Sequence, residues 1–196
     1  VELPESFEKR MQEMLGDEYE SYIESYDKPR QYGLRINPMK ITEEELAEGS
    51  GFSLDPIPWT KTGYFYKEED QPARHPYYSA GLYYLQEPSA MTPAARFPVE
   101  PGERVLDLCA APGGKALHAA QILNGTGMVE ARDLTEMKVE LIRENISRMG
   151  FENIRAVQQN ATCFDADSEE KADVLIADLP CSGLGVMRRK TDIKYK

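Results

Sequence analysis

The clearest pattern in the chain is a short apolar run that ends at glycines and is followed by apolar residues at helical spacing. Residues 105–108 read Val-Leu-Asp-Leu, which is long enough for one buried strand. Pro112-Gly113-Gly114 then requires a tight turn, and after Lys115 apolar residues recur up to Leu123. A strand, a glycine turn and a helix in this order allow a ligand to approach free backbone N–H groups. Because ligands of open α/β sheets bind at the carboxyl ends of the strands, we predict a ligand site at residues 109–115.

The spacing within this turn excludes two familiar phosphate sites. A P-loop needs a glycine five residues before Gly114 and a serine or threonine after Lys115, where this chain has Cys109 and Ala116. The Gly-x-Gly-x-x-Gly spacing of dinucleotide sites is also missing. A glycine pair after a strand often forms only a loop. The turn by itself therefore favours neither a ligand site nor a plain loop.

A second strand–helix unit follows the first and adds an acid. Residues 127–133 form the predicted strand, and apolar positions over 137–149 predict the helix after it. Asp133 lies about 20 residues beyond the glycine turn, where doubly wound folds place the carboxylate that accepts ribose hydroxyls. The alternative is that Asp133 caps the following helix, and the two roles are compatible.

The third apolar run of this region ends in an acid and a thiol. Residues 174–177 predict a buried strand, Asp178 follows at its carboxyl end, and Cys181 comes after Pro180. A thiolate can add to an electron-poor carbon of a planar ring while the acid hydrogen-bonds the ring. A single cysteine is more often inert packing, but the Asp-Leu-Pro-Cys-Ser-Gly context favours the catalytic interpretation.

The residues ahead of the glycine turn predict a small α+β module and a connection to the main sheet. The expected elements are a helix between Pro4 and Gly16, a helix over 19–26 opened by an Asp17–Glu20 capping box, a strand over 32–36, a short helix opened by a Thr42–Glu45 capping box, a hairpin over 57–66, a short strand over 83–86 and a helix over 88–95. A linker over 71–76 follows the hairpin. We therefore predict one domain over 1–75 and a second over 76–196.

Composition places the chain among intracellular globular proteins. Hydrophobic residues make up 41% of the 196 residues, which is enough for a core. No apolar run approaches the roughly 18 residues of a membrane span, and we expect no membrane partner. Three cysteines give no disulfide framework, which fits a reducing cytoplasm. The sequence shows no cluster of metal ligands, so we expect no metal.

The net charge of −11 argues against a simple nucleic-acid binder, which usually carries a basic footprint. The charge is uneven, however, because residues 1–27 hold nine acids and two bases whereas residues 188–196 hold five bases and one acid. The candidate contacts to a phosphate backbone are Arg188, Arg189, Lys194 and, in the first module, Arg35. The alternative for all four is an ordinary solvated surface.

Two motifs carry a resemblance to a known family. Leu108-Cys-Ala-Ala-Pro-Gly-Gly-Lys115 and Asp178-Leu-Pro-Cys-Ser-Gly-Leu-Gly-Val-Met-Arg-Arg189 resemble the Sun-type (NSUN) RNA cytosine-5 methyltransferases, in particular the bacterial RsmB/RsmF-like enzymes of small-subunit ribosomal RNA. Residues 32–38, 81–91 and 191–196 also resemble family segments, with Thr191 in place of the family's proline. The resemblance implies a class I, Rossmann-like, doubly wound α/β sheet that uses S-adenosylmethionine (SAM).

The resemblance also implies the roles of individual residues. The cofactor would lie along Cys109, Ala110, Ala111, Pro112, Gly113, Gly114 and Lys115. Asp133 would hold its ribose and Asn160 would lie near its adenine, although the family usually carries Asp there. The carbonyl of Asn can still accept a hydrogen bond from the adenine amine, so the contact can survive the change. Asp178 would serve both the cofactor pocket and the target cytosine.

The resemblance changes the interpretation of Cys181. Carbon 5 of cytosine becomes nucleophilic when a thiolate adds to carbon 6, and the target base must leave its stack to reach the site. From the residues alone, Cys181 is the candidate nucleophile. The family pattern instead makes Cys181 the thiol that assists product release and puts the nucleophile in a later Thr-Cys motif. We expect that motif, and roughly three more strands of the sheet, beyond Lys196, and therefore a C-terminally truncated chain.

Two rival functions stay open at this point. A non-catalytic fragment that binds cofactor or RNA is favoured by the missing Thr-Cys motif and strands. A class I methyltransferase that acts on protein or a small molecule fits the glycine turn, but amine methylation needs no thiol beside Asp178. The target nucleotide, the choice between naked RNA and an assembled subunit, and the oligomeric state are not set by the sequence.

Overall fold

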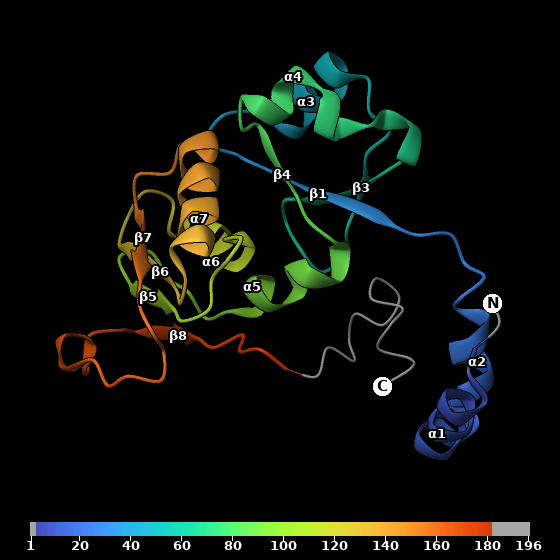
Figure 1. The fold of residues 1–196 in the computed structure, drawn as a ribbon. Helices are drawn as coiled ribbons and strands as arrows, with labels where there is room; N and C mark the ends of the chain where they lie inside the picture. The colour runs from blue at the N-terminus through green and yellow to red at the C-terminus, as the bar shows by residue number, and fades with distance from the viewer. Residues whose placement is uncertain (1–2, 182–196) are drawn as a thin grey trace. The chain divides into compact units, whose positions relative to one another are not determined.

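The computed structural model describes residues 3–181, and Figure 1 shows their course from the N-terminal helices to the last strand. Gln31–Leu179 forms one compact unit, and the helices before Arg30 lie outside it. Those helices are α1 (Glu5–Leu15) and α2 (Tyr19–Glu24), which are joined by the 3-10 turn η1 (Gly16–Glu18). The Asp17–Glu20 capping box predicted for the second helix is wrong. Because η1 runs directly into α2, the residue before α2 is already helical and makes no side-chain cap bond.

The first sheet of the compact unit is antiparallel and has the order β2-β3-β1-β4. Its strands are β1 (Tyr32–Ile36), β2 (Asp55–Pro56), β3 (Gly63–Tyr66) and β4 (Tyr83–Leu85). The predicted strand and hairpin are confirmed, although the first arm of the hairpin lies at 55–56 rather than after residue 57. The sheet continues past residue 75 through β4, and the domain boundary predicted there stays a prediction.

Helix α3 (Glu43–Ser50) covers this sheet and begins at the predicted capping box. The Glu45 N–H donates to Thr42 Oγ1 at 3.2 Å, and the Thr42 N–H donates to Glu45 Oε2 at 2.9 Å. Leu46 of α3 is fully buried against the sheet's core. The shorter elements that follow are η2 (Glu68–Asp70), η3 (Pro72–Arg74), α4 (Pro76–Ser79), η4 (Pro88–Met91) and α5 (Thr92–Arg96).

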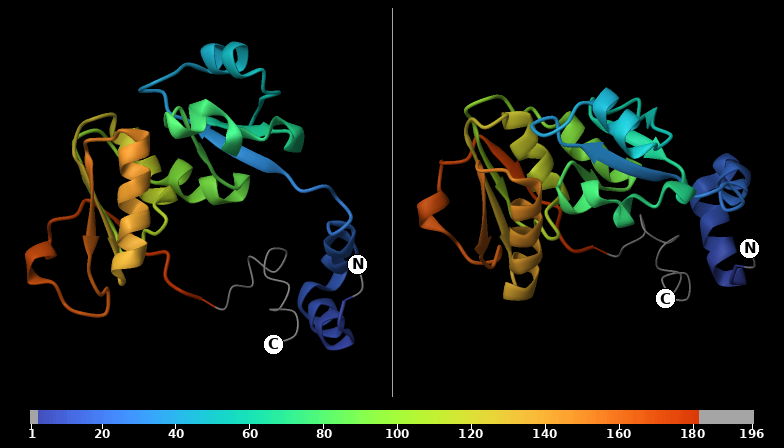
Figure 2. Two further views of the ribbon diagram at one scale, coloured as in Figure 1. Left: turned by 45° about the horizontal axis from the view of Figure 1, so that its top comes forward. Right: turned by 90° about the horizontal axis from the view of Figure 1, so that it is seen from above.

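The second sheet is parallel and has the order β7-β6-β5-β8. Its strands are β5 (Arg104–Asp107), β6 (Met128–Asp133), β7 (Ile154–Gln158) and β8 (Val174–Ile176), and its helices are α6 (Gly114–Leu123) and α7 (Glu136–Met149). Both helices lie on the same side of the sheet, as Figure 2 shows, because β5, β6 and β7 follow one another with crossovers of one hand. Buried side chains of α6 and α7 pack on Val105, Val129 and Ile154 and form the larger core.

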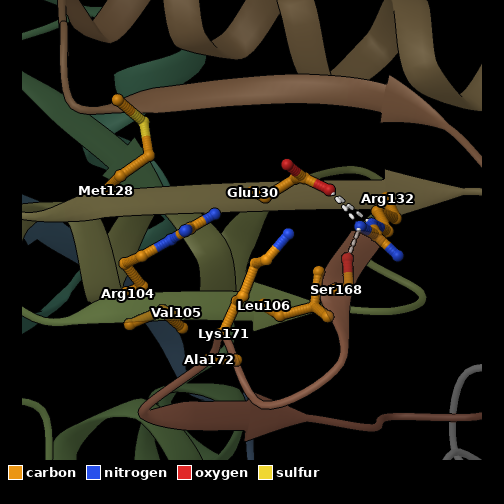
Figure 3. A pocket seen from close by; sticks show the side chains of 9 residues that line it. All are labelled: Arg104, Val105, Leu106, Met128, Glu130, Arg132, Ser168, Lys171 and Ala172. Atoms are coloured by element: carbon orange, nitrogen blue, oxygen red, sulfur yellow. Dashed lines mark hydrogen bonds and ion pairs between the residues drawn. The ribbon is translucent and has the colours of Figure 1, made fainter. Parts of the chain in front are cut away.

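The opposite face of the parallel sheet carries charges. Arg132 forms ion pairs with Glu130 and, at 2.9 Å, with Asp165, which precedes the turn η5 (Ala166–Ser168). Figure 3 shows Arg132 between Glu130 and Ser168, with Lys171 beside them. The pocket between these side chains measures about 20 Å³, so it has room for little more than one water molecule.

Buried polar side chains connect the two sheets. Asn37, directly after β1, donates to the carbonyl of Gly81 at 3.1 Å and to that of Met149 at 2.8 Å. Met149 is the last residue of α7, so one amide group satisfies a helix end and fixes the antiparallel sheet against it. Within residues 3–181, no helix is both long and apolar enough to cross a bilayer.

Candidate functional site

Acidic side chains follow the carboxyl ends of three strands in the parallel sheet. β5 ends at Asp107, β6 ends at Asp133, and Asp178 comes two residues after β8. Because parallel strands finish at one edge, the three acids and the predicted glycine turn share that edge. An edge rich in carboxylates suits a ligand with positive charge or hydroxyl donors and disfavours a phosphate.

Backbone hydrogen bonds hold the glycine turn between β5 and α6. The Gly113 N–H donates to the Ala110 carbonyl at 2.6 Å, and the Ala110 N–H donates to the Arg132 carbonyl at 2.8 Å. Gly113 has φ of +109°, a conformation that strains any residue with a side chain. No side chain caps α6 at Gly113, so the N–H groups of its first turn face the loop without a side-chain acceptor.

Gly114 lies against the segment that follows β4. A Cβ atom at Gly114 would lie 3.2 Å from Gln86 Nε2 and 3.5 Å from the Tyr84 ring. Gln86 Nε2 donates to the Ala90 carbonyl at 3.0 Å, and Gln86 Oε1 is buried with no partner among residues 3–181. Residues 81–91, which resemble a family segment, therefore lie against the glycine turn.

Asp133 is almost fully buried and fixes the glycine turn. Its Oδ2 accepts from the Ala111 N–H at 3.1 Å, and its Oδ1 accepts from the Leu134 N–H at 2.8 Å and from Lys138 Nζ at 3.1 Å. Burial alone would raise the pKa of Asp133, but these donors outweigh it and lower the pKa. The helix-capping alternative is wrong, because the N-cap of α7 is Thr135.

Asp107 is the residue of this edge that the sequence interpretation missed. Its side chain is 1% exposed, and neither carboxylate oxygen has a hydrogen-bond partner of good geometry among the described residues. Burial raises its pKa to about 6, with Asp178 and Asp133 acting in the same direction and the Cys109 amide and Lys115 opposing them. A buried carboxylate without donors is costly, which makes Asp107 a candidate acceptor for a cationic ligand. The only sequence signal was an acid inside an otherwise apolar strand.

Lys115 and Asp178 meet across the mouth of the site. Lys115 Nζ donates to Asp178 Oδ2 at 2.6 Å, and the two side chains are 24% and 60% exposed. Two residues that the sequence assigned to the site from separate motifs are thus brought together. Oδ1 of Asp178 has no hydrogen bond or ion pair within residues 3–181, so it can accept a hydrogen bond from a substrate.

The structure overturns the prediction for Arg35. This side chain is fully buried in β1, where it donates to Gln121 Oε1 and, at 3.4 Å, to the Gly114 carbonyl. Its guanidinium carbon also lies 5.7 Å from the centre of the Tyr84 ring. Alternation along β1 points Arg35 toward α6 rather than toward solvent, so it is not available to a phosphate backbone.

Asn160 lines an open groove of about 610 Å³ together with Leu108 and Phe164. Its Oδ1 accepts from the Thr162 N–H at 3.0 Å and from Thr162 Oγ1 at 2.8 Å. The carbonyl that was expected to meet an adenine amine is therefore already engaged twice. The placement of Asn160 near the adenine stays a prediction, with its Nδ2 as the group left to contact a base.

The cysteines of the described chain are all free thiols. Cys109 is half-buried, and burial together with the charge of Asp133 raises its pKa, so it is a poor nucleophile. Cys163 and Cys181 are exposed. The predicted phosphate contacts Arg188, Arg189 and Lys194 lie outside the described residues. Within 3–181, no group of His, Cys, Asp and Glu is arranged to hold a metal ion.

The parallel sheet, its glycine turn and its acidic strand ends define the class of protein as a Rossmann-like, class I methyltransferase fold. A methyltransferase homologue from Pyrococcus horikoshii has a TM-score of 0.78 and 29% identity to this chain, covering 98% of this chain and 69% of its own. NSun6 from the same organism gives a TM-score of 0.79 at 20% identity over 93% of this chain and 72% of its own. The likeness extends through both sheets, and the expected fold class is confirmed.

The sequence comparisons identify the family. Residues 95–196, more than half of the chain, match the 16S rRNA methyltransferase RsmB/F family, and residues 3–88 match the N-terminal domain of 16S rRNA methyltransferase RsmF. The chain belongs to the RsmB/F family, and the resemblance stated from its motifs is confirmed.

Curated relatives include the ribosomal RNA small subunit methyltransferase F of Citrobacter koseri, at 31% identity, and that of Vibrio campbellii, at 32%. Each alignment covers 98% of this chain, which spans 42% of the length of either relative.

Proposed function

We propose that the protein transfers a methyl group from SAM to carbon 5 of a cytosine in RNA, with small-subunit ribosomal RNA as substrate. The observation that carries this proposal is the acidic strand-end edge, where the buried carboxylate of Asp107 lacks a donor beside the glycine turn. SAM carries a sulfonium, an ammonium and two ribose hydroxyls, and it has no phosphate. Membership of the RsmB/F family supports the choice of cofactor and of RNA as partner.

The residues present fit this cofactor. Asp107 can accept from its ammonium group, and the φ of +109° at Gly113 lets the backbone approach it closely. Asp133 holds the Ala111 amide in place, and its remaining lone pairs face the ribose in this proposal. The neighbour NSun6 was solved with SFG, an analogue of SAM, which agrees with the choice. When bound, the cofactor supplies a methyl group on a positively charged sulfur.

The chain's own residues then act on the cytosine. Asp178, held by Lys115 through one oxygen, offers its free oxygen to the ring and keeps nitrogen 3 protonated. By family resemblance, the thiolate that would add to carbon 6 belongs to the Thr-Cys motif. Carbon 5 would then take the methyl group as the sulfonium's S–CH3 bond breaks and a neutral thioether is released. A base would remove the proton at carbon 5 as the carbon 6–sulfur bond breaks and the thiol leaves. By family resemblance, the exposed thiol of Cys181 assists that last step. We also propose that residues 1–75 form an RNA-recognising module and that the protein acts in the cytoplasm.

Methyl transfer with nucleoside analysis tests the function. Labelled SAM and small-subunit ribosomal RNA are incubated with the protein, and 5-methylcytidine is the expected product. Another methylated nucleoside, or a methylated protein, would contradict the proposal. Cofactor binding without any transfer, even by a chain that carries the Thr-Cys motif, would favour the alternative of a non-catalytic binding protein.

A substitution separates the roles of the thiols. Cys181→Ala in a methylating enzyme is expected to trap a covalent RNA adduct that survives denaturing electrophoresis. Cys163→Ala is the matched control, because Cys163 is also an exposed free thiol. Repeated methyl transfer by Cys181→Ala without a trapped adduct would contradict a role of Cys181 in product release.

A further inference from the structure

A groove of about 710 Å³ opens along the C-terminal half of α6, within the compact unit 31–179. Its walls are the loop between β2 and β3, the end of α5 and the residues around Asn124. Its volume lies in the range of roughly 300–1,000 Å³ that is usual for ligand sites. On α6 the lining begins at His118, about 6 Å of helix rise beyond Gly114, and no residue of the glycine turn or of the acidic strand ends lines the groove. The groove is therefore separate from the strand-end site.

The charge of this groove is opposite to that of the chain. The sequence has 34 acids and 23 bases, yet no Asp or Glu lines the groove. Lys61 and Arg96 do line it, both are exposed, and neither forms an ion pair with any described residue. Two unneutralised cations in a wall without carboxylates favour an anionic ligand.

The lining of the groove also includes two aromatic rings. Trp59 is half-buried, and its Nε1 donates to the Pro88 carbonyl at 3.0 Å. Its ring also meets Phe65 edge to face at a centroid distance of 6.2 Å, so two contacts fix its orientation. Phe97 lines the groove as well. Rigid rings beside cations are the arrangement on which unpaired nucleobases stack.

The α6 wall contributes buried polar groups. His118 is 4% exposed and lines the groove, and its Nδ1 has no hydrogen-bond partner within residues 3–181. Burial, helped by the charge of Arg35, lowers the pKa of His118 to about 2, so the ring is neutral. Gln121, one turn later, donates to Thr62 Oγ1 at 3.0 Å and orients that hydroxyl in the opposite wall. A buried polar atom without a partner needs an explanation, and a ligand in the groove provides one.

We propose that this groove binds a single-stranded segment of RNA, with phosphates at Lys61 and Arg96 and a base against Trp59. The inference rests on the proposed function, because it takes the RNA substrate as its ligand, and it adds a second contact region remote from the methyl-transfer site. A basic groove with stacking rings is common to proteins that hold single strands without reading a duplex. An acidic peptide matches the two cations but gives the rings and the neutral imidazole no role.

The sole tryptophan of the chain makes the test direct. A labelled ten-nucleotide single-stranded RNA is titrated into the 196-residue chain while its anisotropy and the Trp59 emission are both recorded. The two signals are expected to change with the same midpoint. Lys61→Glu with Arg96→Glu should weaken binding at least tenfold, and it should reduce the salt slope of log K by about 1.4, since each single-strand phosphate contact accounts for about 0.7.

The matched control is Lys67→Glu with Lys171→Glu, which changes the charge equally at exposed positions outside the groove. The proposal is overturned if the two double variants weaken binding equally, or if RNA binds while the Trp59 emission stays constant. It is also overturned if only an acidic peptide quenches Trp59. Calorimetric binding of SAM to the same samples keeps the two proposals apart. If SAM binds and RNA does not, the groove proposal alone is contradicted. If RNA quenches the Trp59 emission and SAM does not bind, the proposed cofactor site is contradicted.

Discussion

The two ends of helix α6 present opposite chemistry. Its N-terminal end follows the glycine turn and faces the three acids of the strand ends, one of which is a buried carboxylate without a donor. Its C-terminal half lines a groove that has two cations, two aromatic rings and no acid. One short helix therefore separates a region suited to a cationic nucleoside cofactor from a region suited to an anionic strand.

This difference shows how little the net charge of −11 says about partners. The overall charge argues against a nucleic-acid ligand, whereas the groove at one helix end selects for one. The electrostatic potential at a binding site is set by the residues that line it, because salt screens exposed charges beyond about 10 Å. A substitution at one end of α6 should therefore leave ligand binding at the other end unchanged, unless the residue contacts both ends.

The largest effect is expected at Asp107. Replacing it with Asn removes the buried negative charge and should weaken SAM binding about ten- to a hundredfold, because a hydrogen bond to a charged group contributes roughly 1.5–3 kcal/mol. Binding of single-stranded RNA, followed through Trp59, should not change. Titration calorimetry measures the first quantity, with Asp167→Asn, an exposed acid on η5, as the control. Equal SAM affinity in both variants would mean that Asp107 does not contact the cofactor.

The same substitution has a signature in the pH dependence of stability. Asp107 has a folded-state pKa of about 6, above its ordinary value of 3.8, so protonation favours the folded state. The stabilisation that comes from protonated Asp107 is fully present below about pH 4 and is lost as the pH rises to about 6. The loss is about 3 kcal/mol, because a pKa difference of one unit corresponds to about 1.36 kcal/mol. The free energy of unfolding of wild type minus that of Asp107→Asn should fall across this window. A constant difference from pH 4 to 7 would contradict the burial argument.

A smaller effect is expected at Arg35, which contacts both ends of α6 through Gly114 and Gln121. Arg35→Met leaves the side-chain oxygen Oε1 of Gln121 without its donor, at a cost of about 2 kcal/mol in the free energy of unfolding. Because both ends lose support, SAM and RNA binding should weaken together, which denaturation and the two titrations measure. If RNA affinity fell while stability and SAM affinity stayed unchanged, Arg35 would be an RNA contact after all.

The smallest effect is expected at Lys115. Its ion pair with Asp178 is partly exposed, and such pairs contribute about 0–1 kcal/mol. Lys115→Gln should therefore change the free energy of unfolding by less than about 1 kcal/mol and leave RNA binding at the groove intact. A larger loss of stability in chemical denaturation would mean that this pair holds the mouth of the site together.

Much of the fold was predictable because its signals are local. The glycine turn, the periodicity of α7 and the Thr42–Glu45 capping box each depend on residues within a few positions of one another. Two local predictions were wrong, the Asp17–Glu20 capping box and the helix cap at Asp133, and the other errors concern tertiary contacts. Arg35 looked like a surface base because the sequence does not show that α6 covers that face of β1. Asp107 looked like part of an apolar run because its isolation becomes visible only when the strand ends are assembled.

The candidate site was predictable in part. The acids Asp133 and Asp178 stood out by their positions after strands, and the structure brings both to the edge of the glycine turn. The groove at the other end of α6 was not predicted, because Trp59, Arg96 and His118 come from segments up to about 60 residues apart in the chain. No local pattern connects such residues.

Titration calorimetry of the 196-residue chain with SAM and with ATP tests the central claim most directly. Both ligands carry adenosine, but SAM adds positive charge where ATP adds phosphates. The acidic strand ends should bind SAM at one site per chain and should not bind ATP measurably under the same conditions. Binding of ATP as tight as that of SAM, or no binding of SAM, would contradict the claim that these carboxylates form a site for a cationic cofactor.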